Sequence, residues 1–234
     1  MRDEAGDSSR DPYRDLRVSF TAAVSHELRT PLARLLALLE SASLPGADVP
    51  TALAQARAEV ERMDELVDDV LFLSELETGR EVVSLGSTQA APLLREICDE
   101  LAERSDRAGV GLRVEVEDES IELPLRPRML RVVIQNLAEN ALRYAGEGAT
   151  CTLSLERNDG QVVLAAADDG LGVETEELAR LFERFYRADR ARTSRGTGLG
   201  LSIVKHVVEA AGGEVSVEGG PDQGLAVRCA FPQE

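Results

Sequence analysis

The chain has 234 residues, of which 43% are hydrophobic and 29% charged, which is enough apolar material for one large or two small packed domains. Its formal net charge of −17 argues against nucleic-acid binding, which needs a cationic surface. No apolar run approaches the roughly 20 residues that span a bilayer, and the polar residues 1–10 do not resemble a signal peptide. Three widely spaced cysteines, Cys98, Cys151 and Cys229, indicate a reducing compartment.

Apolar residues recur every three or four positions through residues 11–43, which predicts one long amphipathic helix. Residues 43–50 contain two prolines and a glycine and predict a turn. A second stripe, from Leu53 to Val70, predicts another helix. One hairpin buries both stripes poorly, so we expect two copies of the chain to form a four-helix bundle; the alternative is a strut lying on the rest of the chain. The stripe of the first helix comprises Leu16, Phe20, Val24, Leu28, Leu32, Leu35 and Leu39.

The remaining sequence mixes helical and strand patterns. Residues 80–91 are expected to form a linker, because they lack an apolar period. The expected helices are residues 93–108, 128–144 and 199–211, and the expected strands are residues 110–117, 151–155, 162–167, 214–217 and 225–231.

His26 lies on the side of the first helix opposite the apolar stripe, where a core histidine is not expected. Glu27 follows it directly, and Thr30 lies one turn further along nearly the same face. A neutral imidazole is a nucleophile at physiological pH, and a neighbouring carboxylate can accept a proton from one ring nitrogen while the other attacks. Taken alone, such a pair is more often a solvated surface without function.

Two glycine-rich segments follow or precede expected elements of the second half. Residues 168–173 follow a strand, and residues 196–201 precede a helix. Glycine lets backbone N–H groups approach phosphates, and a helix N-terminus favours anions, although glycine-rich turns are usually only turns. Neither segment fits a P-loop or a dinucleotide-binding fingerprint. The single lysine, Lys205, makes the lysine-based mechanism of ordinary protein kinases improbable.

The helix expected over residues 128–144 carries a polar stripe at spacings of three and four, formed by Asn136, Glu139, Asn140 and Arg143. Amide and carboxylate oxygens suit Mg²⁺, which binds nucleotide phosphates while keeping several waters. Arg143 can neutralise phosphate charge. The alternative is a solvated helix face with a surface ion pair.

Residues 25–32, Ser-His-Glu-Leu-Arg-Thr-Pro-Leu, resemble the phosphoacceptor box of bacterial sensor histidine kinases. In the second half, residues 136–144, 168–173, 181–187 and 196–201 resemble, in order, the N, G1, F and G2 boxes of that family's ATP-binding domain. The resemblance implies an α-helical hairpin that forms a dimeric four-helix bundle, followed by an α/β two-layer sandwich of the histidine-kinase ATPase type. It implies a dimerisation and phosphoacceptor domain at residues 1–79, a linker at 80–91 and an ATP-binding domain at 92–234.

The same resemblance implies residue roles. His26 would accept the phosphoryl group, Glu27 would act as general base, and Thr30 would position the water that later removes phosphate from the partner protein. Asp168 would hydrogen-bond the adenine amino group, and Asn140 would ligate Mg²⁺. The other implied ATP contacts are Asn136, Arg143, Tyr144, Gly170, Gly172, Arg187, Gly196, Thr197, Gly198, Leu199 and Gly200.

Local charge agrees with a triphosphate site, because residues 180–195 are basic within an acidic chain and arginine forks match phosphate oxygens. Arg187 closes the F box and is the first candidate among them. The segment's arginines are Arg180, Arg184, Arg187, Arg190, Arg192 and Arg195.

The expected activity is ATP-dependent autophosphorylation of His26, followed by transfer to an aspartate of a response-regulator receiver domain, with an additional phosphatase activity toward the regulator. The alternatives are a phosphatase-dominant protein and a non-enzymatic dimeric scaffold with a degenerate nucleotide site. The expected partners are a second copy and the regulator, without nucleic acid. We expect a cytoplasmic chain, either a soluble kinase or the cytoplasmic part of an inner-membrane receptor whose membrane segment precedes it.

Overall fold

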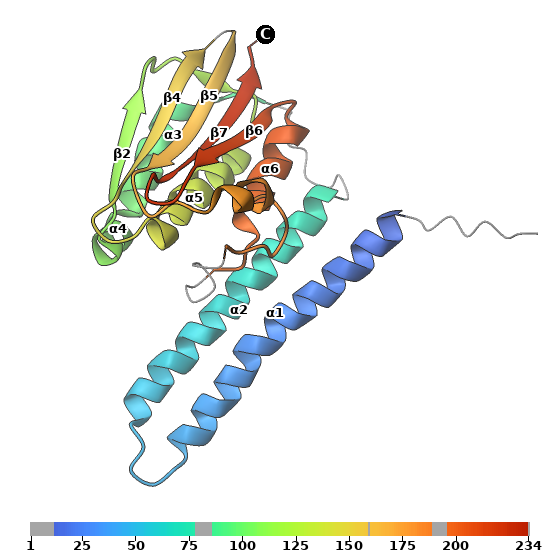
Figure 1. The fold of residues 1–234 in the computed structure, drawn as a ribbon, viewed down its shortest axis with the longest axis vertical. Helices are drawn as coiled ribbons and strands as arrows, with labels where there is room; N and C mark the ends of the chain where they lie inside the picture. Colours follow the sequence, from blue (N-terminus) through green and yellow to red (C-terminus); the bar gives the residue numbers. More distant parts are fainter. Residues whose placement is uncertain (1–11, 78–85, 159, 189–195, 234) are drawn as a thin grey trace, which may run out of the picture. The chain divides into compact units, whose positions relative to one another are not determined.

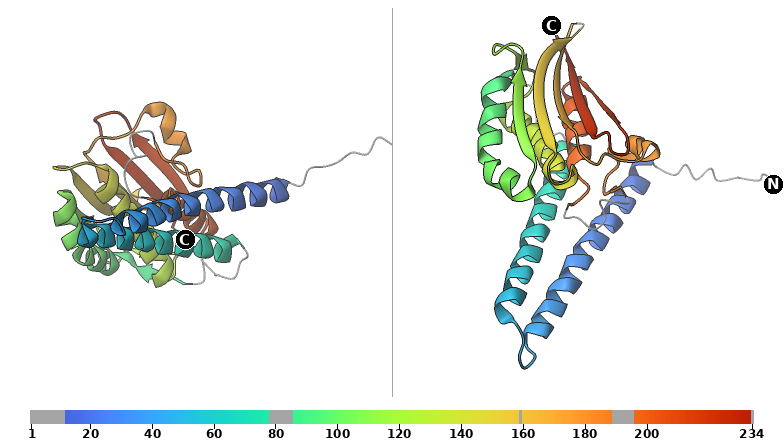
Figure 2. Two further views of the ribbon diagram at one scale, coloured as in Figure 1. Left: turned by 90° about the horizontal axis from the view of Figure 1, so that it is seen from below. Right: turned by 60° about the vertical axis from the view of Figure 1, so that its left-hand side comes forward.

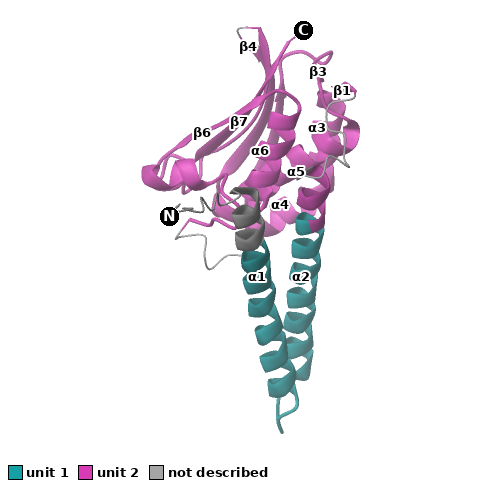
Figure 3. Cartoon of the chain, turned by 90° about the vertical axis from the view of Figure 1, so that its right-hand side faces the viewer, with its two compact units in different colours: residues 1–70 teal, residues 71–234 magenta. Residues whose placement is uncertain are grey.

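The computed structural model describes residues 12–77, 86–158, 160–188 and 196–233, and it leaves the side chains of residues 12–20 undescribed. The chain divides into two compact units, residues 1–70 and 71–234, which Figure 3 colours separately. Within the described ranges, every helix is too short or too polar to cross a membrane.

The first unit is an antiparallel helical hairpin (Figure 1). It consists of α1 (Pro12–Ala42) and most of α2 (Val49–Glu77), as the apolar periods predicted. The Oδ1 atom of Asp48 accepts a hydrogen bond from the backbone N–H of Thr51 at 3.2 Å and so caps the start of α2. Large apolar side chains remain exposed along both helices, including Leu36 at 55% and Leu53 at 56%. Leu16 and Phe20, predicted for the same stripe, lie among the undescribed side chains.

The second unit contains a five-stranded sheet of order β2-β4-β5-β7-β6. The β2–β4 pair is parallel, and the other three pairs are antiparallel. The helices cover one face of the sheet (Figure 2), which confirms the predicted two-layer α/β sandwich. The elements are α3 (Ala90–Glu100), α4 (Ala102–Ala108), β2 (Gly111–Val116), α5 (Pro127–Tyr144), β4 (Thr150–Asn158), β5 (Gln161–Asp168), the 3₁₀ helix η1 (Thr175–Arg180), α6 (Gly200–Ala210), β6 (Glu214–Gly219) and β7 (Leu225–Pro232).

A small second sheet precedes α3, in a stretch that the sequence predicts as linker. It pairs β1 (Thr88–Gln89) with β3 (Glu122–Leu123) in antiparallel register. The helix α3 begins at Ala90, three residues before the predicted Leu93. The N–H of Ala90 donates to the carbonyl oxygen of Ile121 at 3.2 Å. A two-residue strand carries no apolar period, and therefore only long-range pairing reveals it. The helix predicted over residues 93–108 is divided into α3 and α4 at Leu101.

The core lies between the sheet and the apolar side of α5. Pro127 occupies the first turn of α5, where a missing N–H is tolerated. Leu130, Ile134 and Leu137 are almost completely buried on this helix, as are Leu153 and Phe231 on the strands. Fully burying such side chains contributes about 1.5–3 kcal/mol each. Because the apolar side of α5 faces the sheet, its polar side is available for the site.

Candidate functional site

His26 is exposed on α1, as predicted. Its side chain is 77% accessible, and its Nδ1 atom lies 3.8 Å from Oε1 of Glu27. The hydroxyl of Thr30 donates to the carbonyl oxygen of His26 at 3.4 Å. Pro31, which follows, has no N–H to donate to the preceding turn. The imidazole is therefore accessible to a second molecule or domain, with a carboxylate near one of its two nitrogens.

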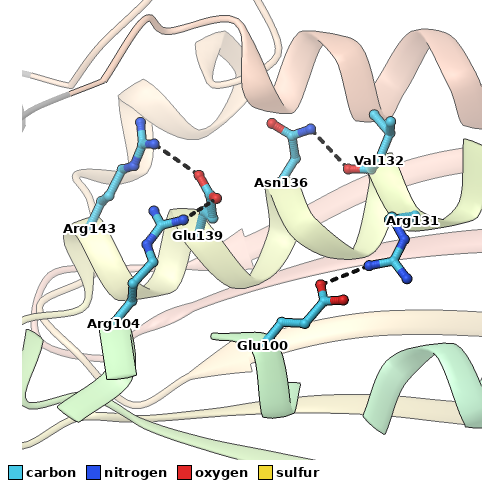
Figure 4. A network of polar contacts seen from close by, with 7 residues as sticks. All are labelled: Glu100, Arg104, Arg131, Val132, Asn136, Glu139 and Arg143. Carbon is cyan, nitrogen blue, oxygen red and sulfur yellow. Dashed lines mark hydrogen bonds and ion pairs between the residues drawn. The ribbon is translucent and has the colours of Figure 1, made fainter. Parts of the chain in front are cut away.

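The polar residues of α5 form a half-buried stripe opposite its core side. Asn136 donates from Nδ2 to the carbonyl oxygen of Val132 at 2.9 Å, which orients its side-chain amide. Glu139 accepts from Arg143 at 2.9 Å, one helical turn further along (Figure 4). Asn140 directly follows Glu139 on α5 and is also half-buried. Local spacing predicted this stripe, and the structure places it on one side of α5.

Arg104, on α4, joins the same stripe. Its Nη1 atom donates to the second oxygen of Glu139 at 2.6 Å (Figure 4). No sequence motif indicates Arg104, which lies 35 residues before Glu139. Only the packing of α4 beside α5 brings the two side chains together.

The first glycine segment is held tightly at the end of β5. The N–H of Leu171 donates to the carbonyl oxygen of Ala145 at 2.9 Å, joining this segment to the end of α5. A Cβ on Gly170 would collide with the backbone of Ala145. Gly172 has φ +58°, and a Cβ there would likewise collide with the carbonyl oxygen of Gly220, so the close backbone approach requires glycine at both positions.

Asp168 is the last residue of β5 and the first of this segment, and it is partly buried. Burial raises the pKa of its carboxyl group above the ordinary value, while hydrogen bonds from the N–H groups of Gly170 and Leu225 oppose the shift. The Gly170 bond to Oδ1 measures 3.0 Å. A carboxylate oriented by backbone donors can accept a hydrogen bond from an amino group of a ligand.

The second glycine segment lies against the polar side of α5. A Cβ on Gly200 would come within 2.5 Å of Oδ1 of Asn136, and one on Gly196 would collide with the hydroxyl of Tyr144. The hydroxyl of Thr197 accepts a hydrogen bond from the N–H of Leu199 at 3.2 Å and shapes the approach to α6. The structure therefore brings these residues beside α5, a placement that no local sequence pattern predicts.

The segment of residues 181–187 contacts the second glycine segment through the backbone, because the N–H of Phe185 donates to the carbonyl oxygen of Gly198 at 2.9 Å. Arg187 is half-buried next to the buried Ala188. Within the basic segment predicted to hold phosphates, Arg190, Arg192 and Arg195 lie outside the described residues.

The residues around α5 fit a Mg²⁺–nucleotide complex better than a protein-only metal centre. Among the described residues, no group of three or more histidine, cysteine or acidic side chains could hold a metal ion. Asn140 offers one amide oxygen, and Mg²⁺ commonly completes its coordination with water and substrate phosphates.

Two family models match the chain. Residues 16–79 match the His Kinase A (phospho-acceptor) domain, and residues 125–234 match the histidine kinase-, DNA gyrase B- and HSP90-like ATPase. The signal transduction histidine-protein kinase BaeS of Escherichia coli is 35% identical over 231 residues, which cover 97% of this chain and 49% of BaeS. The sensor histidine kinase WalK of Bacillus subtilis is 32% identical, over 92% of this chain and 36% of WalK. The chain thus spans at most about half the length of these relatives.

Solved structures have the same fold. Full-length ShkA, crystallised in complex with AMPPNP, has a TM-score of 0.67 and 30% identity over 90% of this chain and 45% of that chain. Histidine kinase ThkA, in complex with the response regulator protein TrrA, has a TM-score of 0.74 at 20% identity, over 94% of this chain and 64% of that chain. With a phosphoacceptor match on the hairpin and an ATPase match on the sandwich, the chain belongs to the sensor histidine kinases and comprises their catalytic core.

Proposed function

We propose that this chain autophosphorylates His26 with ATP and passes the phosphoryl group to an aspartate of a response regulator. The observation that carries the proposal is the exposed imidazole of His26 beside Glu27 on the hairpin, in a chain whose second unit gathers Asn136, Arg143 and the glycine segments around α5. The assigned domains are residues 1–79 for dimerisation and phosphoacceptance and 92–234 for ATP binding, joined by residues 80–91, the last of which form β1 and the start of α3.

The chemical step is an in-line displacement at the γ-phosphorus. Since Glu27 lies near Nδ1 of His26, we assign Nε2 as the attacking atom. Its lone pair forms the N–P bond while the bond to the β–γ bridging oxygen breaks, and ADP leaves with that electron pair. Glu27 accepts the proton from Nδ1 as positive charge develops on the ring. This reaction depends mainly on positioning and electrostatic stabilisation.

The nucleotide site is assigned from the residues that surround α5. Asp168 would accept a hydrogen bond from the adenine amino group, and Asn140 would bind Mg²⁺, which neutralises phosphate charge when bound. Asn136 would support the phosphate end of the site, and Arg143 and Tyr144 would reach the phosphates or the ribose. The remaining assigned contacts are Gly170, Gly172, Arg187, Gly196, Thr197, Gly198, Leu199 and Gly200.

The partners are a second copy of the chain and a receiver domain. The exposed leucines of the hairpin, among them Leu36 and Leu53, support a dimeric bundle, because burying two apolar stripes against each other removes them from water and lowers the free energy. ThkA bound to a response regulator protein supports the second partner by analogy. Thr30 would position the water that dephosphorylates the regulator. We assign the chain to the cytoplasmic part of a sensor.

Incubation with Mg²⁺ and γ-labelled ATP tests the proposal. The wild type is expected to acquire an acid-labile label, and His26→Ala is expected to acquire none while binding ATP with unchanged affinity. Ser41→Ala is the matched control, because Ser41 is exposed on the same helix outside residues 25–32 and its hydroxyl donates to the carbonyl oxygen of Leu38 at 3.1 Å; this variant should label normally. Label retained in His26→Ala would refute the assignment of the phosphoacceptor. Absence of ATP binding by the wild type would favour a scaffold.

A further inference from the structure

Arg104 lies between the two segments that match family models, yet its side chain reaches the polar stripe of α5. Its Nη1 atom is 2.6 Å from Oε1 of Glu139, and Nη2 of Arg143 is 2.9 Å from Oε2 of the same carboxylate (Figure 4). One carboxylate therefore holds two guanidinium groups, one from α4 and one from α5.

The backbone fixes the position of α4. At its start, the N–H of Ser105 donates to the carbonyl oxygen of Leu101, a buried residue, at 2.8 Å. At its end, Gly109 adopts φ +65°, and its carbonyl oxygen accepts from the N–H of Gly148 at 2.7 Å. Arg104 itself is 41% accessible, so its side chain is not part of the core. The helix thus presents Arg104 to Glu139 from a fixed base.

Arg143 also extends toward the second glycine segment. A Cβ built on Gly196 would lie 3.6 Å from Nη1 of Arg143, while Nη2 is held by Glu139. The orientation of Glu139 therefore affects where the guanidinium of Arg143 lies.

We propose that Arg104 is a positioning residue for the phosphates of the nucleotide and acts through Glu139 on Arg143. It holds one carboxylate oxygen of Glu139, so that the other oxygen orients Arg143 toward Gly196. The inference rests on the proposed ATP-binding function and adds to it a residue outside both family matches.

Arg104→Ala tests this role, with Arg107→Ala as the matched control. Arg107 is an arginine of the same helix, is 74% accessible, and forms an ion pair with Glu103. Arg104→Ala is expected to raise the Kd and KM for ATP about threefold to fivefold without changing kcat, as the loss of a partly exposed ion pair implies. Arg107→Ala should change neither constant. Arg104→Lys should recover most of the affinity, because an ammonium can still donate to Oε1.

A double-mutant cycle with Arg143→Ala separates this role from a general structural one. Once Arg143 is removed, adding Arg104→Ala should change the Kd for ATP by less than about twofold. An unchanged Kd and KM in Arg104→Ala, or the same loss with and without Arg143, would overturn the inference while leaving the proposed function intact. A wild type that binds no ATP would instead overturn the proposed function, and the inference with it. Urea unfolding of each variant checks that the fold is retained.

Discussion

The N–H of Phe185 donates to the carbonyl oxygen of Gly198 at 2.9 Å, and both residues adopt positive φ, +62° and +71° respectively. Glycine adopts this conformation without steric penalty, whereas a phenylalanine there is strained. The strained aromatic residue is thus held by the glycine segment that lies against the polar side of α5.

Gly198→Ala should destabilise the second unit by about 2–4 kcal/mol, combining backbone strain with overpacking. The new Cβ would lie 2.9 Å from the carbonyl carbon of Phe185 and 3.0 Å from the carbonyl oxygen of Tyr186. Gly212→Ala is the matched control, because Gly212 has φ +78° with nothing within 4 Å of its Cβ position. It should lose only about 1–2 kcal/mol. Urea unfolding measures both, and equal losses would contradict the contact with Phe185.

Asp168→Asn should stabilise the unliganded protein at pH 7. Burial raises the pKa of Asp168 in the folded state, so folding favours the protonated carboxyl group. The stability associated with that proton is present at low pH and is lost as pH rises through the folded-state pKa. The gain from asparagine should therefore shrink as pH falls through this pKa. Unfolding free energies measured from pH 7 to pH 3 check the trend.

Asp169→Asn is the matched control for that experiment. Asp169 is exposed, and its Oδ1 accepts a hydrogen bond from the N–H of Thr150 at 2.6 Å. Removing its charge weakens this bond without relieving burial, so Asp169→Asn should not stabilise the protein. If both variants gained the same unfolding free energy at pH 7, the cause would be reduced repulsion among acidic groups and not the burial of the Asp168 carboxylate.

The thiols should report unfolding of the second unit. Burial raises the pKa of Cys151 and of Cys229 to about 12, so about one in 10⁴ of these groups would be thiolate at pH 8. Burial also raises the pKa of the half-buried Cys98. A thiol-reactive disulfide reagent should modify Cys98 first in the native protein, and all three cysteines in urea. Native Cys98→Ser should then react slowly, and rapid reaction of this variant would contradict the burial of the other two thiols.

Leu53→Glu should weaken dimerisation of the hairpin without changing ATP affinity. Leu53 is 56% exposed in the single chain, and a glutamate in an apolar interface would be desolvated without a partner. Gln55→Glu adds the same charge at an exposed polar position of α2 and should leave the dimer intact. Sedimentation equilibrium of both variants measures the association. A wild type that is monomeric at all concentrations would contradict the proposed bundle.

Local sequence patterns predicted much of the architecture. The period of three to four predicted α1 and α2, and the same angular argument placed His26 on the exposed side, where the structure has it. Apolar alternation predicted the strands of the larger sheet to within a few residues, because it reflects which face of a strand is buried. Motif resemblance indicated the family, which the family models then confirmed.

By itself, then, the sequence determined the long helices, the strands of the larger sheet and the exposed side of His26, because each follows from the repeat of side chains along one element. Only the tertiary structure decided that Thr88 pairs with Leu123, and that Arg104 shares Glu139 with Arg143. Such contacts join residues that lie roughly 35 positions apart and depend on how whole elements pack, which no local period records.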